Sequence, residues 1–125
     1  MNSLSKSILL VEDDRSLRDL MTMILELEGY KVAVAHDGQQ AIDHLEKHEV
    51  DLVLLDLFMP ILDGTHVLHW IRVEKTMETK VLVITAMTDD KTQSSIMAAG
   101  ANALIKKPLD VDKIIQSVKA LLESS

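Results

Sequence analysis

The sequence has no cysteine, which excludes disulfides, thiolate catalysis and thiolate metal sites. Aromatic residues are nearly missing, because Tyr30, Phe58 and Trp70 together make up only 2% of the 125 residues. The core must therefore be aliphatic, and no aromatic platform exists for stacking nucleic-acid bases. The chain also lacks a surplus of positive charge: its formal net charge of −7 argues against direct binding to nucleic acid.

Long apolar runs are absent as well. No stretch approaches the roughly 18 residues of a membrane span, and residues 1–7 lack the apolar core of a signal peptide. With 47% hydrophobic and 26% charged residues, the composition is typical of a globular protein, and the length matches one domain over residues 1–125. We therefore expect a cytoplasmic protein with no membrane insertion, a location that the lack of cysteine also suits.

What the chain does contain is an alternation of short apolar runs with amphipathic segments. The runs have the length of buried strands, at residues 8–11, 32–35, 52–55, 81–84 and 103–105. Five such units in succession are too few for the eight-stranded barrel. They predict an α/β protein with a doubly wound (βα)5 flavodoxin-like fold, a three-layer sandwich around a parallel sheet of strand order 2-1-3-4-5.

Helical spacing marks the segments between these runs. The first helix is predicted to bury an apolar stripe, consisting of Leu17, Leu20, Met21, Ile24 and Leu27, and to end before Gly29. The third is predicted to run through Val67, Leu68 and Ile71, and the fourth to begin near Asp89 or Asp90 and stop at Gly100. Asp14 and Asp110 are predicted to cap the first and last helices.

Polar residues follow four of the five apolar runs. They are Glu12-Asp13-Asp14, Asp56, Thr85 and Lys106-Lys107. If the strands are parallel neighbours, these groups meet at the carboxyl edge of the sheet, where open α/β folds bind ligands. At 4 Å, each pair of unpaired acids costs about 4 kcal/mol at an effective dielectric near 20. A raised pKa, a lysine or a cation must therefore neutralise them.

Oxygen ligands without histidine or cysteine favour magnesium or calcium over zinc, and a site with open positions suits Mg²⁺. A carboxylate beside Mg²⁺, with a hydroxyl and a lysine near by, is the arrangement of an aspartyl-phosphate site. The carboxylate attacks phosphorus, the metal screens the repulsion between anions, and the hydroxyl and ammonium bind phosphoryl oxygens. The sequence therefore predicts phosphoryl chemistry at this edge.

The motifs now resemble a known family, the receiver domain of two-component response regulators of the chemotaxis-regulator type. They are Val11-Glu12-Asp13, Leu55-Asp56, Met59-Pro60, Asp63-Gly64, Ile84-Thr85-Ala86 and Lys107-Pro108, and together they span essentially the whole chain in order. The resemblance implies that Asp56 is the phosphoacceptor. It also implies that Asp13 is a direct Mg²⁺ ligand and that Glu12 acts through water.

Further roles follow from the same resemblance. The backbone carbonyl of Phe58 is a further metal ligand, and Mn²⁺ is expected as a substitute for Mg²⁺. Thr85 is the switch hydroxyl. Lys107 pairs with the phosphoryl group, because the family's lysine directly precedes proline and strand alternation directs Lys106 to the opposite face. Pro108 supports the bend that aims Lys107, often through a cis bond in this family.

The sequence departs from the family pattern at a few positions. Glu12 stands where Asp is commoner, with little expected effect. Leu104 stands where relatives usually carry Tyr or Phe, which puts the usual coupling of that ring to the Thr hydroxyl in question. Phe58 and Met87 occupy positions that flank the route of the attacking water, and neither side chain can orient a water. We therefore expect slow hydrolysis of the phosphorylated form.

The resemblance implies a signalling switch that catalyses only its own phosphorylation and dephosphorylation. Its expected partners are a histidine kinase or a histidine phosphotransfer protein, and a downstream protein target or effector domain. A homodimer through the fourth helix, fifth strand and fifth helix is a further expectation. The chain is then either a single-domain regulator or a piece of a longer protein.

Three alternatives remain open at this stage. A magnesium-dependent hydrolase of the haloacid-dehalogenase type would also use a strand-end Asp, but it needs a second Asp where this chain has Phe58. A flavodoxin-like FMN carrier would need Ser, Thr or Gly in the first loop, which is instead Glu-Asp-Asp. A degenerate receiver would only bind partners, although all the residues for phosphorylation are present.

Overall fold

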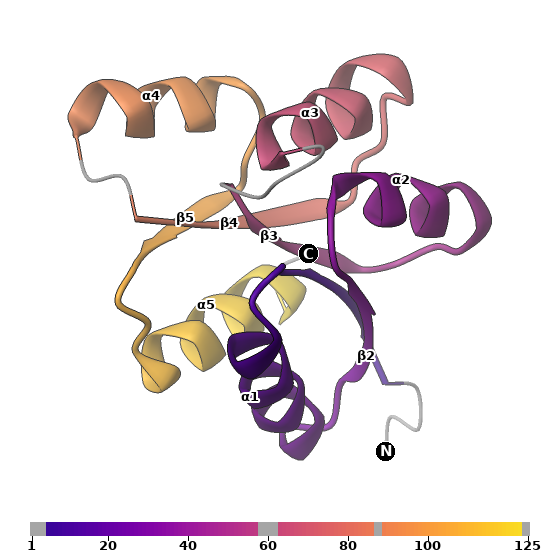
Figure 1. The fold of residues 1–125 in the computed structure, drawn as a ribbon, viewed down its shortest axis with the longest axis vertical. Coiled ribbons are helices and arrows are strands. Elements are labelled where there is room, and N and C mark those ends of the chain that lie inside the picture. Colours follow the sequence, from indigo (N-terminus) through magenta and orange to yellow (C-terminus); the bar gives the residue numbers. More distant parts are fainter. Residues whose placement is uncertain (1–4, 58–62, 87–88, 124–125) are drawn as a thin grey trace.

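Five parallel strands form one sheet in the order β2-β1-β3-β4-β5, which confirms the predicted topology (Figure 1). The structure is a computed structural model, and it describes residues 5–57, 63–86 and 89–123. The strands are β1 (Ser7–Val11), β2 (Lys31–Ala35), β3 (Leu52–Asp56), β4 (Lys80–Thr85) and β5 (Ala103–Lys106).

Apolar residues on both faces of the strands create two separate cores. Along β1, Leu9 and Val11 face one core, whereas Ile8 and Leu10 face the other. This alternation follows from the two-residue period of a strand. A strand buried on both faces must be apolar throughout, which is why these segments read as continuous hydrophobic runs.

Helices cover both faces of the sheet and complete a three-layer sandwich (Figure 1). They are α1 (Arg15–Leu27), α2 (Gly38–Lys47), α3 (Gly64–His69), α4 (Asp90–Ala98) and α5 (Val111–Glu123). Helices α1 and α5 pack on one face, and α2, α3 and α4 pack on the other. Within the described residues, no helix combines the length and apolar character needed to span a bilayer.

The ends of the helices agree with the predicted caps. The carboxylate of Asp14 accepts a hydrogen bond from the Leu17 N–H, and Asp89 does the same for the N–H of Thr92. Asp110 accepts from the N–H groups of the first turn of α5. Each aspartate therefore satisfies a backbone donor that the helix itself leaves without a partner. Gly29 follows α1 with φ of +98°, a conformation that favours glycine.

The predicted buried stripe of α1 was wrong at two positions. Leu20 and Leu27 are 45% and 79% exposed, whereas Met21 is buried as predicted. Leu25 and the nearly buried Arg18, which the prediction did not include, complete the buried positions of the helix. Leucine and methionine occur on several sides of this helix, so the apolar pattern does not select one face. An arginine on the buried stripe needs polar partners, and these lie at the sheet edge described below.

The predicted third helix extends through Ile71, but its geometry changes before that residue. Helix α3 passes at Trp70 into a π-helical turn, η1 (Trp70–Glu74), in which the N–H of Lys75 donates to the carbonyl of Trp70. Trp70 and Ile71 are both buried. The wider turn brings Arg72 within hydrogen-bond distance of the Gly100 carbonyl, far along the chain.

Candidate functional site

The polar residues that end the strands meet at the carboxyl edge of the sheet because the strands are parallel and in register. Val11 lies beside Leu55, and Thr85 lies beside Lys106. Glu12 follows Val11, Asp56 follows Leu55 and Lys107 follows Lys106, so these residues lie with Thr85 at the same edge of the sheet. Asp56 is 2% exposed, and its neighbour on the adjoining strand is Ile84.

Three carboxylates form an acid cluster at this edge, made by Glu12, Asp13 and Asp56. One oxygen from each lies within 4.8 Å of the others, with Glu12 and Asp56 buried and Asp13 exposed. Burial raises the pKa of the Glu12 carboxyl to about 8, a rise that the N–H of Asp14 opposes and that the nearby Asp56 reinforces. Without a cation, the cluster therefore favours a proton on Glu12 at neutral pH.

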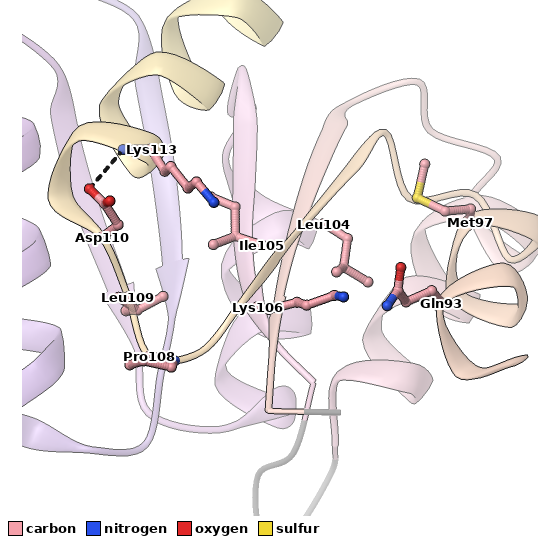
Figure 2. Close-up of a pocket in the computed structure, with 9 residues that line it drawn as sticks. All are labelled: Gln93, Met97, Leu104, Ile105, Lys106, Pro108, Leu109, Asp110 and Lys113. Carbon is pink, nitrogen blue, oxygen red and sulfur yellow. Dashed lines mark hydrogen bonds between the residues drawn. The ribbon is translucent and has the colours of Figure 1, made fainter. Parts of the chain in front are cut away.

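A lysine from the loop after β5 completes the charge arrangement. The Nζ of Lys107 lies 3.2 Å from Oδ2 of Asp56, and the backbone N–H of Lys107 donates to the carbonyl of Thr85. Lys106 lies elsewhere, at the groove between α4 and the β5–α5 loop, near Gln93 (Figure 2). The peptide bond between Lys107 and Pro108 is cis.

The donor set of the acid cluster fits a hard divalent cation. All its ligand atoms are carboxylate oxygens, which suits Mg²⁺ rather than zinc. Among the described residues, buried Oε1 of Glu12 has no hydrogen-bond partner, although Oε2 accepts from the N–H of Asp14 at 3.1 Å. When Glu12 is ionised, this buried oxygen has no donor, which is costly. A bound cation at Glu12, Asp13 and Asp56 would satisfy it.

Gly64, at the start of α3, lies directly against the backbone of Asp56. Its N–H donates to the carbonyl of Leu57 at 2.9 Å. A Cβ at this position would lie 2.6 Å from the Asp56 carbonyl oxygen and 2.8 Å from Cα of Leu57. Only glycine permits this approach, so the Asp63-Gly64 motif has a direct structural reason: it lets the helix pack beside the candidate phosphoacceptor.

Arg18 is a residue at this edge that the sequence reasoning missed. Its Nη1 donates to the carbonyl of Glu12 at 2.9 Å and lies 3.3 Å from that of Asp13. Its burial could have been predicted from the sequence, because Arg18 lies three positions before Met21 and seven before Leu25, the spacing of one helical face.

The structure brings together Glu12, Asp13, Asp56 and Lys107, and it places Thr85 buried at the neighbouring end of β4. The predictions for Phe58 and Met87 lie outside the described residues, as does the Met59-Pro60 motif.

The family model described as the response regulator receiver domain matches residues 8–119. The chain is 38% identical over 118 residues to the transcriptional regulatory protein CpxR of Escherichia coli (strain K12), an alignment that covers 94% of this chain and 50% of CpxR. This chain thus spans about half the length of that relative.

Solved structures agree in fold. The Francisella response regulator 1452 receiver domain superposes with a TM-score of 0.91 at 24% identity, covering 95% of this chain and 98% of that one. A response regulator receiver domain protein (CheY-like) from Methanospirillum hungatei JF-1 gives a TM-score of 0.86 at 29% identity, with 96% and 95% covered.

Proposed function

Because the chain belongs to the response regulator receiver domain family, we propose that it is a phosphoacceptor switch in a two-component system or phosphorelay, with Asp56 as the residue that receives the phosphoryl group. One observation carries the assignment. Asp56 is buried at the end of a central strand, beside two other carboxylates and within 3.2 Å of a lysine ammonium. A structural aspartate would not need both the extra acids and the cation.

The chemistry is a transfer between nitrogen and oxygen. A carboxylate oxygen of Asp56 attacks the phosphorus of a phosphohistidine on a kinase or phosphotransfer protein. The O–P bond forms as the N–P bond breaks, and the electron pair of that bond returns to the imidazole nitrogen. Lys107 leaves its contact with the carboxylate of Asp56 to pair with the phosphoryl group, and the hydroxyl of Thr85 binds another phosphoryl oxygen.

Glu12, Asp13, Asp56 and the backbone carbonyl of Phe58 would hold Mg²⁺, or Mn²⁺ in its place. When bound, the ion supplies positive charge that offsets the repulsion between the carboxylates and the incoming phosphoryl group.

Burial of Asp56 excludes most water from the acceptor. Phe58 and Met87, two residues beyond Asp56 and Thr85 in the sequence, are apolar and cannot orient a hydrolytic water, so we expect the aspartyl phosphate to be hydrolysed slowly. If the phosphorylated protein loses phosphate rapidly, and Phe58→Asn does not change that rate, the expectation of slow hydrolysis is wrong.

Phosphorylation adds about −1.5 to −2 charges at the strand ends and shifts an equilibrium between surface conformations. The responsive surface is the face formed by α4, β5 and α5, where a groove lies beside Lys106, Leu104 and Met97 (Figure 2). A downstream protein, an effector domain or a second copy of the chain binds there. Leu104 cannot act as the aromatic switch of relatives, so movement of Thr85 and of the segment before α4 transmits the signal.

The test adds beryllofluoride or acetyl phosphate with Mg²⁺ and follows the amide resonances of the protein. We expect shifts around Asp56 and across α4, β5 and α5, and none in Asp56→Asn. Asp51→Asn is the matched control, because Asp51 directly precedes the same strand at its opposite end. An Asp56→Asn protein that still responds would refute the assignment. Steady release of phosphate from a small phosphate ester would instead favour the hydrolase alternative.

A further inference from the structure

Arg18 is a charged residue on a helix face that otherwise packs into the core. It is 9% exposed and shares the buried stripe of α1 with Met21 and Leu25, which are at most 1% exposed. A guanidinium at such a position needs strong hydrogen bonds to offset its loss of hydration. Its partners are backbone carbonyls of the segment that carries the acid cluster, those of Glu12 and Asp13.

The two carbonyls belong to consecutive peptide groups. In a trans peptide the C=O and the following N–H point in opposite directions. The carbonyl of Asp13 is directed toward Arg18, and the N–H of the same peptide group belongs to Asp14. That N–H donates to Oε2 of Glu12 at 3.1 Å. The Asp13–Asp14 peptide is therefore held from both sides, by the guanidinium at its oxygen and by the Glu12 carboxylate at its nitrogen.

This arrangement forms a chain of hydrogen bonds from a cation to a candidate metal ligand. Hydrogen bonds in series polarise one another, so a guanidinium on the carbonyl strengthens the N–H as a donor to Glu12. The same contacts fix the backbone from which the Asp13 carboxylate projects. Lys107 differs, because it reaches the cluster by bonding a carboxylate oxygen of Asp56. Arg18 offsets negative charge through the backbone and leaves the carboxylate oxygens for a cation.

We infer that Arg18 is a positioning residue of the divalent-cation site, acting through the Asp13–Asp14 peptide group on Glu12 and Asp13. The inference rests on the proposed function, since it assumes that the acid cluster binds Mg²⁺. Groups that orient metal ligands typically contribute about 10- to 100-fold to metal affinity. Both hydrogen bonds come from one guanidinium nitrogen, Nη1, whose direction the rigid planar group fixes, and the freely rotating ammonium of lysine does not reproduce that fixed direction.

The test is a Mg²⁺ titration followed by amide resonances, for wild type, Arg18→Met and Arg18→Lys. Arg15→Met is the matched control, because Arg15 lies on the same helix with 87% of its side chain exposed and its removal changes the net charge equally. We expect the dissociation constant for Mg²⁺ to rise about tenfold or more in Arg18→Met and by less than about twofold in Arg15→Met. Arg18→Lys should recover only part of the loss.

A second readout does not depend on the metal. In the metal-free protein, loss of the guanidinium should move the Asp14 amide proton upfield, toward the value of a weaker hydrogen bond, and Arg15→Met should leave it in place. With acetyl phosphate, Arg18→Met should raise the Mg²⁺ concentration for half-maximal labelling of Asp56, with a smaller effect on the rate at saturating Mg²⁺.

A folded Arg18→Met protein that binds Mg²⁺ within twofold of wild type would overturn the inference. An equal loss of Mg²⁺ affinity in Arg15→Met would also overturn it, because the effect would then be one of net charge alone. If Arg18→Met does not fold, Arg18→Lys decides, and wild-type affinity with an unmoved Asp14 amide would refute the role. Failure of wild type to bind Mg²⁺ would remove the metal site of the proposed function itself, a result distinct from loss in the Arg18 variants alone.

Discussion

At the amino ends of β4 and β5, Arg72 makes three hydrogen bonds, whereas at the carboxyl ends of β1 and β3 three carboxylates lie close together. Arg72 donates to the carbonyls of Gly100 and Met77 and to Oδ1 of Asn102, at 2.8–2.9 Å. The same Asn102 oxygen accepts from the N–H of Val81. Polar groups at this amino edge satisfy one another with partners drawn from distant segments.

The carboxyl edge is arranged in the opposite way. Buried Glu12 has an oxygen without a donor among the described residues, and its pKa is raised to about 8. Lys107 pairs with Asp56, but the cluster holds two further carboxylates, those of Glu12 and Asp13. Polar groups at the amino edge thus stabilise the fold, whereas the negative charges at the carboxyl edge are only partly offset. Under the proposed function, a cation and a phosphoryl group would complete the second edge, and its groups would serve binding at the expense of stability.

The largest change in stability should come from the amino edge. Arg72→Met removes three hydrogen bonds and leaves their acceptors without this partner, which we expect to lower the free energy of unfolding by about 2–4 kcal/mol. Urea denaturation measures the loss. The Mg²⁺ affinity of the folded variant should stay within twofold of wild type. If Arg72→Met keeps its stability but loses Mg²⁺ binding, the proposal that the amino edge stabilises the fold and the carboxyl edge binds the cation is wrong.

Gly64→Ala should affect both stability and the site, because the added Cβ meets backbone atoms of Asp56 and Leu57 that cannot easily move. We expect a loss of about 1–3 kcal/mol and slower labelling of Asp56 by acetyl phosphate. Gly29→Ala is the matched control: it introduces strain at φ of +98° but has no heavy atom within 4 Å of the new Cβ. It should lower the melting temperature without changing the labelling rate, and equal effects of the two variants on labelling would contradict the proposed contact.

The raised pKa of Glu12 gives a pH dependence with a defined sign. The folded, metal-free protein keeps a proton on Glu12 up to pH about 8, whereas the unfolded chain releases it near the ordinary value of 4.5. Between these values the folded state binds more protons, so this group's contribution to stability is lost as pH rises through about 8. Mg²⁺ requires the ionised form, and its affinity should therefore rise with pH, by at most about tenfold per unit, and level off above about 8.

Thermal unfolding with and without Mg²⁺, at a series of pH values, measures this effect. The increase in melting temperature caused by Mg²⁺ should be larger at pH 8.5 than at pH 6. In Glu12→Gln, which does not titrate, that difference should become small. A pH dependence that survives in Glu12→Gln would assign the titration to another group.

The contrast between the edges also explains what the sequence allowed us to predict. The strands and their polar ends were predictable, because apolar runs of strand length are buried on both faces and the parallel order then collects Glu12, Asp56 and Thr85 at one edge. The role we infer for Arg18 was not: helical spacing places it on the face of Met21 and Leu25, but the sequence does not specify that the carbonyls of Glu12 and Asp13 point toward it. Likewise, Arg72 in the π-helical turn bonds to Gly100 and Asn102, residues far along the chain that no local pattern connects to it.

The smallest expected effect concerns Asp51, at the amino end of β3. Its carboxylate accepts from the N–H of Ser7 at 2.8 Å, and its own N–H donates to the carbonyl of Ser7. Asp51→Asn keeps an oxygen in place but removes the charge, so we expect a loss of about 0.5–1 kcal/mol in urea denaturation. Mg²⁺ affinity and labelling of Asp56 should not change. Since Asp51 and Asp56 flank one strand, a clear loss of Mg²⁺ binding in Asp51→Asn would mean that the two edges are coupled through β3, and that stability and binding are not separated as we propose.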